Sequence, residues 1–212
     1  MASISSLSDA CEALLLDASV VVNLNATGYS AQILSALPFK VLVPRPVIRE
    51  LRNGAANGHA DATDLDALIG QSIVQEAPVV GAAQGEFIAL TSGASVSSLG
   101  DGEAATIACA FSSGAWAAID ERKARRICAE RYQTVKVVST VDILAYDSVG
   151  EVLTEDEMAK SVFAALEVAN MHVHAQHLDW VVSWIDDVQL ERCRSLPRSV
   201  RERQMRVAKT AG

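Results

Sequence analysis

Short apolar runs alternate with helix-like segments along residues 10–150, and this alternation restricts the fold more than any other feature of the chain. The runs are ALLL, KVLV, AWAAI and TVKVV, and each precedes a segment whose apolar residues recur at helical spacing. Pro38, Gly54 and Gly150 mark the ends of helical segments, because proline and glycine interrupt regular structure. The last of these segments, STVDILAYDSVG, is predicted to be one helix that ends at Gly150. Repeated strand–helix units predict an α/β fold with an open, mostly parallel sheet flanked by helices.

Residues 151–212 carry a different pattern, which predicts an all-helical extension of the 1–150 domain. Thr154 and Glu157 have the spacing of a capping box at a helix start, and apolar residues then recur as far as Leu190. On one helix, Trp180 and Trp184 lie on a different face from the aliphatic residues around them. Those aliphatic residues are Leu178, Val181, Val182, Ile185 and Val188. Two apolar faces need two partners, and the second is either another chain, as in a homo-oligomer, or the parent domain again.

The composition excludes several classes of protein. Half of the 212 residues are hydrophobic, so the chain can bury a substantial core. No apolar stretch reaches the roughly 20 residues that a membrane helix needs, and an N-terminus whose first basic residue is Lys40 does not resemble a secretory leader. The four cysteines are far apart and form no C-x-x-C pair, which favours reduced thiols. These features predict a cytoplasmic protein with no membrane partner.

The formal charge of −8 is unevenly distributed along the chain. Residues 191–212 hold seven Arg and Lys against two Glu, so the rest of the chain is strongly acidic. Such a basic tail is compatible with a nucleic-acid backbone, with an acidic partner, or with a solvated terminus. An acidic body argues against non-specific coating of nucleic acid, but it leaves room for a local substrate site.

Five carboxylates lie beside predicted strand ends or helix starts: Asp17, Glu50, Asp101, Glu103 and Asp120. Apolar runs precede three of them, and a buried carboxylate is costly unless it is paired or bound to a metal. Taken singly, each has an ordinary structural explanation, such as a helix cap or a solvated helix position. Together they come from four segments that a parallel sheet brings to the same edge, where α/β proteins bind ligands. A divalent cation would allow these acids to coexist.

Four segments resemble the PIN-domain family, which consists of nucleases and includes many toxins of bacterial toxin–antitoxin pairs. The segments are LLLDASVVVNLNATG, FKVLVPRPVIREL, LGDGEAATIACAFSSGAWAAIDERKAR and VKVVSTVDIL, in the order in which the family has them. Asp17 resembles the first acid of the family, Glu50 the second and Asp120 the acid after the fourth strand. Glu103 matches the position of the third acid better than Asp101 does. In the last motif, Ser139 and Asp142 stand where the family usually has glycines.

The resemblance implies a metal-dependent endoribonuclease that hydrolyses RNA phosphodiester bonds with Mg²⁺ or Mn²⁺. It also suggests a biological role as the toxin of a toxin–antitoxin pair. Asp17 and Asp120 would be the principal metal ligands, and Glu103 a further ligand, directly or through water. Glu50 would orient or deprotonate the attacking water, and Asp101 would help to bind a second ion. The alternative is a catalytically silent PIN-like module that binds nucleic acid or protein.

Three further assignments follow from the resemblance. Ser19 would hold one of the carboxylates in place. The basic residues after Asp120 would contact the RNA backbone, although a charged helix face is the commoner explanation for such a run. These residues are Arg122, Lys123, Arg125 and Arg126. Residues 151–212 would bind an antitoxin protein or a second copy of the chain.

Overall fold

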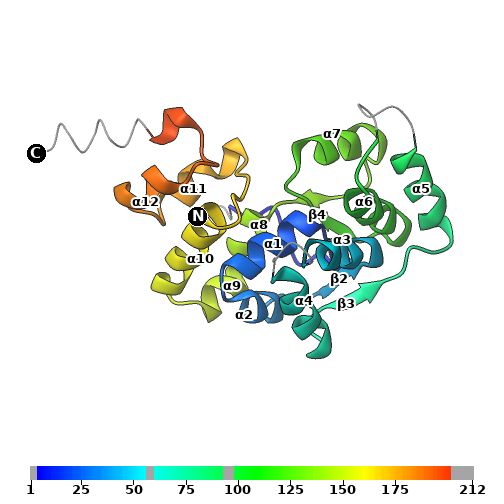
Figure 1. The fold of residues 1–212 in the computed structure, drawn as a ribbon, viewed down its shortest axis with the longest axis horizontal. Coiled ribbons are helices and arrows are strands. Elements are labelled where there is room, and N and C mark those ends of the chain that lie inside the picture. The colour runs from blue at the N-terminus through cyan, green and yellow to red at the C-terminus, as the bar shows by residue number, and fades with distance from the viewer. Residues whose placement is uncertain (1–3, 56–59, 93–97, 202–212) are drawn as a thin grey trace, which may run out of the picture.

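A single parallel sheet of five strands forms the centre of the molecule (Figure 1). The computed structural model describes residues 4–55, 60–92 and 98–201. The sheet has the order β3-β2-β1-β4-β5, and all neighbouring strands run parallel. The strands are β1 (Ala13–Leu16), β2 (Lys40–Pro44), β3 (Gln75–Ala77), β4 (Trp116–Ala118) and β5 (Val137–Val138). The prediction of an α/β fold with a parallel sheet is confirmed.

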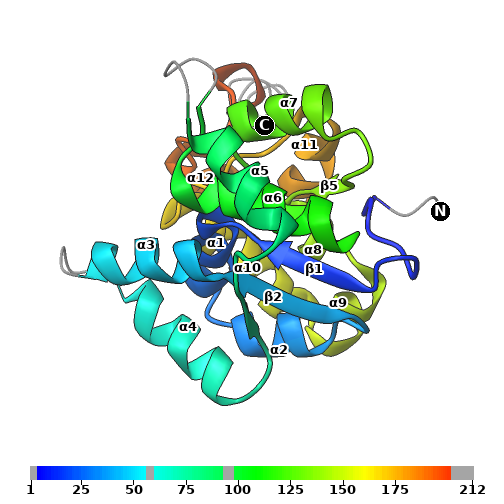
Figure 2. The same ribbon diagram turned by 90° about the vertical axis from the view of Figure 1, so that its right-hand side faces the viewer.

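Helices connect the strands and continue beyond the sheet. Those before β4 are α1 (Ala18–Ala26), α2 (Ser30–Ser35), α3 (Arg45–Ala55), α4 (Asp61–Gly70), α5 (Ala82–Thr91) and α6 (Asp101–Ser113). Those after β4 are α7 (Arg122–Arg131), α8 (Thr140–Leu144), α9 (Asp147–Val152), α10 (Glu155–Glu167), the 3₁₀ turn η1 (Ala175–His177), α11 (Leu178–Val182) and α12 (Asp187–Arg192). Figure 2 shows α5, α6 and α7 on one side of the sheet and α2 and α9 on the other.

The alternation of side chains along β1 divides the core between the two faces of the sheet. Leu15 packs with residues of α5, α6 and α7, whereas Leu14 and Leu16 pack with residues of α1, α8 and α10. Successive side chains of a strand point to opposite faces, so an uninterrupted apolar run suits a strand that is covered on both sides. The run ALLL is buried for this reason.

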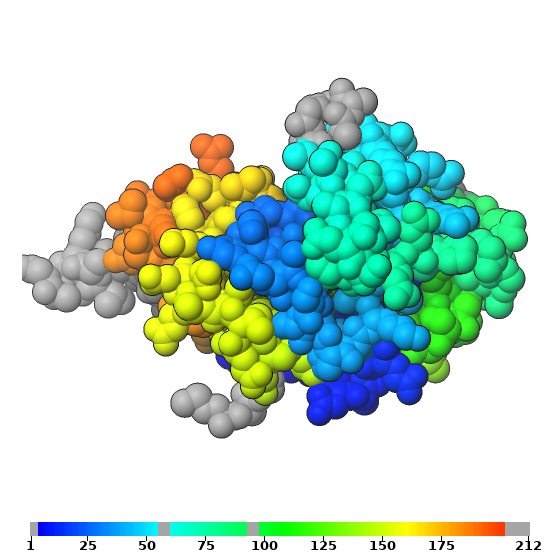
Figure 3. Space-filling model, turned by 90° about the horizontal axis from the view of Figure 1, so that it is seen from below, coloured from blue at the N-terminus to red at the C-terminus, as the bar shows by residue number. Residues whose placement is uncertain are grey.

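The C-terminal segment packs on the same core as residues 1–150. Met158, Val162 and Leu166 of α10 are buried, and α10 contacts α1. In Figure 3, α10 and the segment after it (yellow to orange) lie beside the blue segment that contains α1. Val181 and Leu190 belong to the same core cluster. The division into two domains at residue 150 remains a prediction.

The prediction of a single helix over STVDILAYDSVG is wrong. The segment forms α8 and α9, separated at Ala145 and Tyr146, and Gly150 lies inside α9 instead of ending a helix. Tyr146 has an extended backbone, its hydroxyl donates to Asp9 Oδ1 at 2.9 Å, and its ring meets that of Phe39 edge-on at 5.8 Å. These tertiary contacts hold Tyr146 between the two helices.

The prediction of one long helix with two apolar faces near Trp180 is also wrong. The segment is divided into η1, α11 and α12, and the Asp186 side chain accepts the Gln189 N–H at 2.8 Å to cap α12. Trp180 and Trp184 meet edge-on at 5.8 Å and pack against the internal core, whereas Val188 is 71% exposed. The two-faced helix that motivated a second chain at this place therefore does not form.

No helix in the described ranges is both long and apolar enough to span a bilayer. The four cysteines are buried and unpaired. Burial raises the pKa of the Cys11, Cys128 and Cys193 thiols to about 11, so these side chains behave as small apolar groups.

Candidate active site

Asp17 and Asp120 follow two neighbouring strands of the sheet. Leu16, the last residue of β1, pairs with Ala118 of β4, and the Asp17 N–H donates to the Ala118 carbonyl oxygen at 3.1 Å. Because parallel strands end at the same edge, this register brings both carboxylates to one place. Asp17 is also the residue before α1, where carboxylates are favoured by the partial positive charge of the helix N-terminus.

Asp120 is held by three donors from two other segments. The backbone N–H of Thr140 donates to Oδ1 at 2.9 Å, while the Thr140 hydroxyl and Nδ2 of Asn23, the latter at 2.7 Å, donate to Oδ2. Burial raises the pKa of Asp120 above its ordinary value, although these hydrogen bonds and the nearby Arg125 oppose that rise. The donors therefore fix the orientation of this carboxylate before any ligand binds.

Asp17 is almost fully buried and has few partners for its charge. The Ser19 hydroxyl donates to its Oδ2 at 2.8 Å, as expected for the residue two positions after the acid. Burial raises the pKa of Asp17 to about 7, with smaller contributions in the same direction from Glu103 and Glu50. No Lys or Arg forms an ion pair with Asp17 or Glu50 within the described ranges. Asp17 and Glu50 are therefore not neutralised by a paired basic side chain within these ranges.

Glu103 and Glu50 approach Asp17 from two helices. Glu103 lies in the first turn of α6, where its Oε2 accepts the Gly100 N–H at 3.0 Å. Burial raises the pKa of Glu103, and the charges of Glu121 and Glu50 act in the same direction. Burial and the charge of Asp101 likewise raise the pKa of Glu50, which accepts the backbone N–H of Gly102.

Gly102 explains how the two helices come so close. A methyl group at this buried position would overlap Glu50 Oε2 and would lie 3.5 Å from Asp17 Oδ1. It would also lie 3.4 Å from a methyl group of Val47 on α3. Only glycine leaves room there for Glu50 to reach toward Asp17.

The acids border a pocket of about 660 Å³ whose wall comes partly from the C-terminal segment. Ser19, Asn23, Glu50 and Asp120 line it from the sheet edge. Other lining residues are Asp61, Glu121, Arg122, Ala169, Asn170 and His172. Asp17 and Glu103 are not part of this lining, and their charges interact with each other and with Glu50. Asp120 shares the pocket lining with Glu50, and Asp101 is exposed, with a charge that acts on Glu50.

Whether these residues suit a metal ion depends on their chemistry and their surroundings. No three His, Cys, Asp or Glu side chains within residues 4–55, 60–92 and 98–201 already form a metal-binding cluster. The donors are nevertheless carboxylates, which Mg²⁺ and Mn²⁺ prefer, and the pKa values of all four are raised. Since a divalent cation would relieve both the burial cost and the mutual repulsion, the residues fit such an ion.

The basic residues of α7 are mostly engaged with the protein itself. Lys123 donates to the Ser98 carbonyl oxygen at 2.6 Å, and Arg125 donates to the carbonyl oxygens of Ile119 and Val138, each at 2.8 Å. Arg126 pairs with Glu130 at 3.1 Å. Arg122 lines the acidic pocket, so it is the member of the predicted group that is best placed to meet a substrate.

Asn23, Thr140 and Gly102 were not predicted from the sequence as site residues. Asn23 lies four residues after Ser19, on the same face of α1, and that spacing is the signal that marks it. Thr140 lies within VKVVSTVDIL, the last segment of the resemblance, yet its contact with Asp120 spans 20 positions in the chain. Gly102 lies between the two candidate acids Asp101 and Glu103, where a glycine in a helix start has many ordinary explanations.

Comparison with known proteins identifies the family. A family model described as a PIN domain matches residues 13–186, whereas no curated protein and no solved structure matches the chain significantly. PIN domains are generally nucleases, they bind nucleic acid and they typically use divalent metal ions. The matched range contains all five acids and the C-terminal residues that line their pocket, and it covers most of the chain. The chain therefore belongs to the PIN-domain family.

Proposed function

We propose that this protein is a metal-dependent endoribonuclease that uses Mg²⁺ or Mn²⁺. One observation carries the proposal: Asp17 and Asp120 are buried at the ends of neighbouring strands, Glu50 and Glu103 from two helices interact with Asp17, and the pKa of all four carboxyls is raised. Evenly solvated surface acids would not be arranged in this way, because burying a carboxylate without a partner costs free energy. A bound divalent cation would offset the free-energy cost of burying these carboxylates, so their burial is explained if they form a cation site.

Each residue has a role that follows from its surroundings. Asp17 and Asp120 would hold the metal ion, Glu103 would add a ligand directly or through water, and Asp101 at the exposed rim would help with a second ion. The bound ion supplies an activated water and charge relief at the leaving oxygen. Glu50 accepts the Gly102 N–H and borders the pocket, so it is placed to orient the attacking water and to take its proton.

Three other side chains keep the acids in position. Ser19 donates to Asp17, while Asn23 and Thr140 donate to Asp120. Donors that hold a carboxylate near its working orientation reduce the reorganisation needed when a metal and a substrate bind. Arg122, at the pocket edge, is placed to contact a phosphate of the RNA.

The role as a toxin, with an antitoxin protein that binds the chain, is a further part of the proposal and rests on the family resemblance. Inducible expression of the chain would arrest growth, and expression of the Asp17→Asn variant at the same level would not. Unchanged growth with active, well-expressed protein would separate the toxin role from the nuclease activity.

Mn²⁺ is expected to raise the melting temperature of the wild-type protein by several degrees at pH 8, because it binds the folded acids and not the unfolded chain. Single-stranded RNA is expected to be cut with Mn²⁺ or Mg²⁺ and to stay intact with EDTA. Differential scanning fluorimetry and gel analysis of a labelled RNA measure the two effects. A metal ion that neither stabilises the protein nor permits cleavage would favour the catalytically silent binding module.

Gly102→Ala is expected to lower the cleavage rate by about tenfold or more with little loss of stability. The added methyl group would push the Glu50 carboxylate away from Asp17, and small displacements of a catalytic group can cost about a hundredfold in rate. Because Glu50 is a flexible, exposed side chain, the fold can accommodate the change. Gly85→Ala is the matched control, since Gly85 is an exposed helical glycine with nothing within 4 Å of the added carbon. Equal cleavage rates in the two variants would show that Gly102 does not position Glu50.

A further inference from the structure

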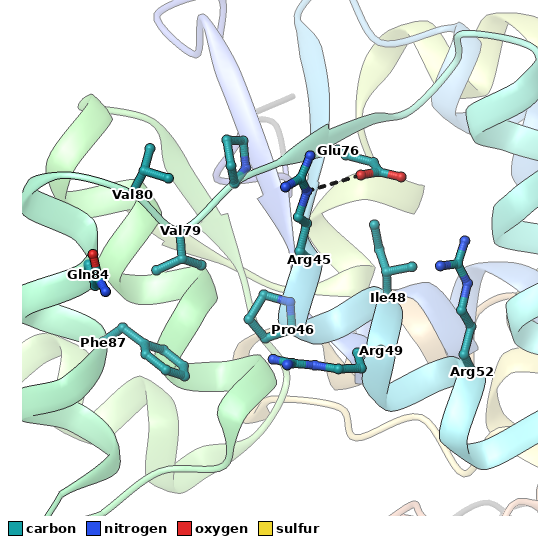
Figure 4. A pocket seen from close by; sticks show the side chains of 11 residues that line it. Arg45, Pro46, Ile48, Arg49, Arg52, Glu76, Val79, Val80, Gln84 and Phe87 are labelled. Atoms are coloured by element: carbon teal, nitrogen blue, oxygen red, sulfur yellow. Dashed lines mark hydrogen bonds and ion pairs between the residues drawn. The ribbon is translucent and has the colours of Figure 1, made fainter.

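A second pocket, of about 580 Å³, lies between α3 and the segment from β3 to α5 (Figure 4). Arg45, Arg49 and Arg52 line it from α3, and Phe87 and Gln84 line it from α5. In Figure 4 the Arg49 side chain extends from α3 toward Phe87. The pocket therefore combines a row of positive charge with an aromatic ring.

The three arginines lie on one face of α3. Their spacing of four and three residues places them one above another, over about 10 Å of helix. All three are exposed. Arg45 pairs with Glu76 at 3.3 Å and Arg52 with Asp66 at 2.8 Å, both at the surface. Arg49 forms no ion pair within residues 4–55, 60–92 and 98–201. Because exposed ion pairs contribute little stability, these guanidinium groups can exchange a carboxylate for a phosphate.

The rest of the pocket presents apolar surface to a ligand. Phe87 is partly buried, and Pro46, Pro78 and Val79 lie near it in the lining. Unpaired bases stack on aromatic rings and on guanidinium planes, whereas a paired duplex hides its base faces. Phosphate-binding arginines beside an accessible ring therefore match a single strand better than a duplex.

The position of this pocket links it to the acids. Helix α3 carries the arginine row on one face and Glu50 on an adjoining one, and Glu50 and Leu51 line the acidic pocket. We propose that the arginine pocket binds the single-stranded RNA next to the bond that is cut, with phosphates on the arginines and a base against Phe87. This inference rests on the proposed nuclease function, which it extends by naming the form of RNA and its path.

Binding can be measured without cleavage by adding EDTA. The probe is a fluorescein-labelled single-stranded RNA of 12 nucleotides, and the readout is fluorescence anisotropy at about 50, 100 and 200 mM NaCl. Arg49→Ala/Arg52→Ala is compared with Lys40→Ala/Lys136→Ala, which removes the same charge from two exposed lysines near the starts of β2 and β5. Circular dichroism checks that both variants are folded.

The arginine variant is expected to bind the RNA about tenfold or more weakly at 100 mM NaCl. The slope of log K against log salt should fall by about 1.4, since each phosphate contact to a single strand contributes about 0.7. The lysine variant should stay within about twofold of wild type, because Lys40 and Lys136 lie at the amino ends of their strands and do not line the arginine pocket. Phe87→Leu should weaken binding by about tenfold through lost stacking while keeping the salt slope.

Three results would overturn the proposal: wild-type protein that does not bind the RNA, arginine and lysine variants that bind it equally well, or a labelled poly-glutamate peptide that binds the same arginines as tightly as RNA does. The last would identify a docking site for an acidic protein segment. The nuclease proposal is tested separately by cleavage with Mn²⁺. If RNA binds through the arginines but is not cleaved, the proposal for the arginine pocket stands and the nuclease proposal is rejected. If RNA is cleaved at the same rate with and without the arginines, the nuclease proposal stands and the proposal for the arginine pocket is rejected.

Discussion

Asp17→Asn is expected to lower the rate of RNA cleavage by about a thousandfold or more while making the metal-free protein more stable at pH 8. The first effect follows from losing a metal ligand, since metal-assisted charge relief supplies several kcal/mol of transition-state stabilisation. The second follows from the burial of Asp17, which raises the pKa of its carboxyl to about 7. A substitution that removes activity and adds stability identifies a residue that is kept for its chemistry.

The pH dependence of the stability effect has a definite sign. The ordinary pKa of this carboxyl is 3.8 and the folded value is about 7, so the folded protein holds a proton that the unfolded chain releases between these values. The contribution of Asp17 is therefore most favourable below pH 4 and is lost as the pH rises through 7. The total change is on the order of 4 kcal/mol. Asparagine carries no charge at any pH, so the variant should have a clearly larger free energy of unfolding than wild type at pH 8 and a similar one at pH 4.

Urea unfolding in EDTA at pH 4, 6 and 8 measures this difference. Asp101→Asn is the matched control, because Asp101 is an exposed acid at the same rim, and its stability should stay close to that of wild type at each pH. If Asp17→Asn were less stable than wild type at pH 8, the buried, ionised carboxylate of Asp17 would not be destabilising the folded protein. If the variant cleaved RNA as fast as wild type, Asp17 would not be a metal ligand.

Asp142→Ala is expected to destabilise the protein by about 3–5 kcal/mol, because it leaves several buried donors without an acceptor. Asp142 accepts the Ser6 N–H at 2.7 Å and both the N–H and the hydroxyl of Ser139, at 2.8 and 2.6 Å. His177 Nε2 lies 3.3 Å from its Oδ1, and both side chains are 1% exposed. This one carboxylate therefore connects the N-terminal residues, α8 and the C-terminal segment.

The contribution of Asp142 to stability also depends on pH, with a sign opposite to that of Asp17. Burial alone would raise the pKa of Asp142, but hydrogen bonds from His177, Ser139 and the Ser6 N–H outweigh it and hold the pKa well below its ordinary value of 3.8. The stabilisation is thus present above pH 4 and is lost as the pH falls below it. Urea unfolding at pH 7 and pH 3 should show a large gap between variant and wild type that narrows in acid.

Asp147→Ala provides the control for this second experiment. Asp147 is an exposed acid in the first turn of α9, and its loss should cost less than about 1 kcal/mol. Equal stability of the Asp142→Ala and Asp147→Ala variants at pH 7 would show that the buried hydrogen bonds of Asp142 contribute no more than a surface charge.

The Asp142 network shows where sequence patterns stop being sufficient. Ser139 and Asp142 stand where the family motif has two glycines, and this departure alone does not indicate what the two side chains contact. In the structure, the Asp142 side chain accepts the N–H and the hydroxyl of Ser139, which caps α8. The partners Ser6 and His177 lie 136 and 35 positions away in the chain, and no local pattern indicates such contacts.

Other differences have similar physical causes. The strands and helices next to Asp17, Glu50 and Asp120 were predicted because their apolar residues recur with a clear strand or helix period. This period arises because each of these elements buries one or both of its faces. Strand β3 was not predicted, since QEA is an edge segment that is half exposed and lacks an apolar pattern. The break between α8 and α9 depends on the tertiary contacts of Tyr146, which a periodic pattern does not contain.

The family resemblance predicted which acids form the site, whereas the donors that hold them could be found only from three-dimensional contacts. Asn23 and Thr140 are polar residues in segments that read as core, and a sequence alone does not say which carboxylate they meet. Of the basic tail, Arg203, Arg206 and Lys209 lie outside the described residues. Arg192 pairs with Glu167 and lies 5.1 Å from the ring centroid of Phe163, so part of the basic charge near this end contributes to packing.

The pocket wall formed by Ala169, Asn170 and His172 has a consequence for the order in which the molecule is made. A ribosome releases the N-terminal part of a chain first, and that part can begin to fold during synthesis. Every acid of the site precedes this wall by at least 49 positions in the chain. The nascent protein can therefore assemble its carboxylates before the pocket beside them is closed, and the finished site appears only late in synthesis.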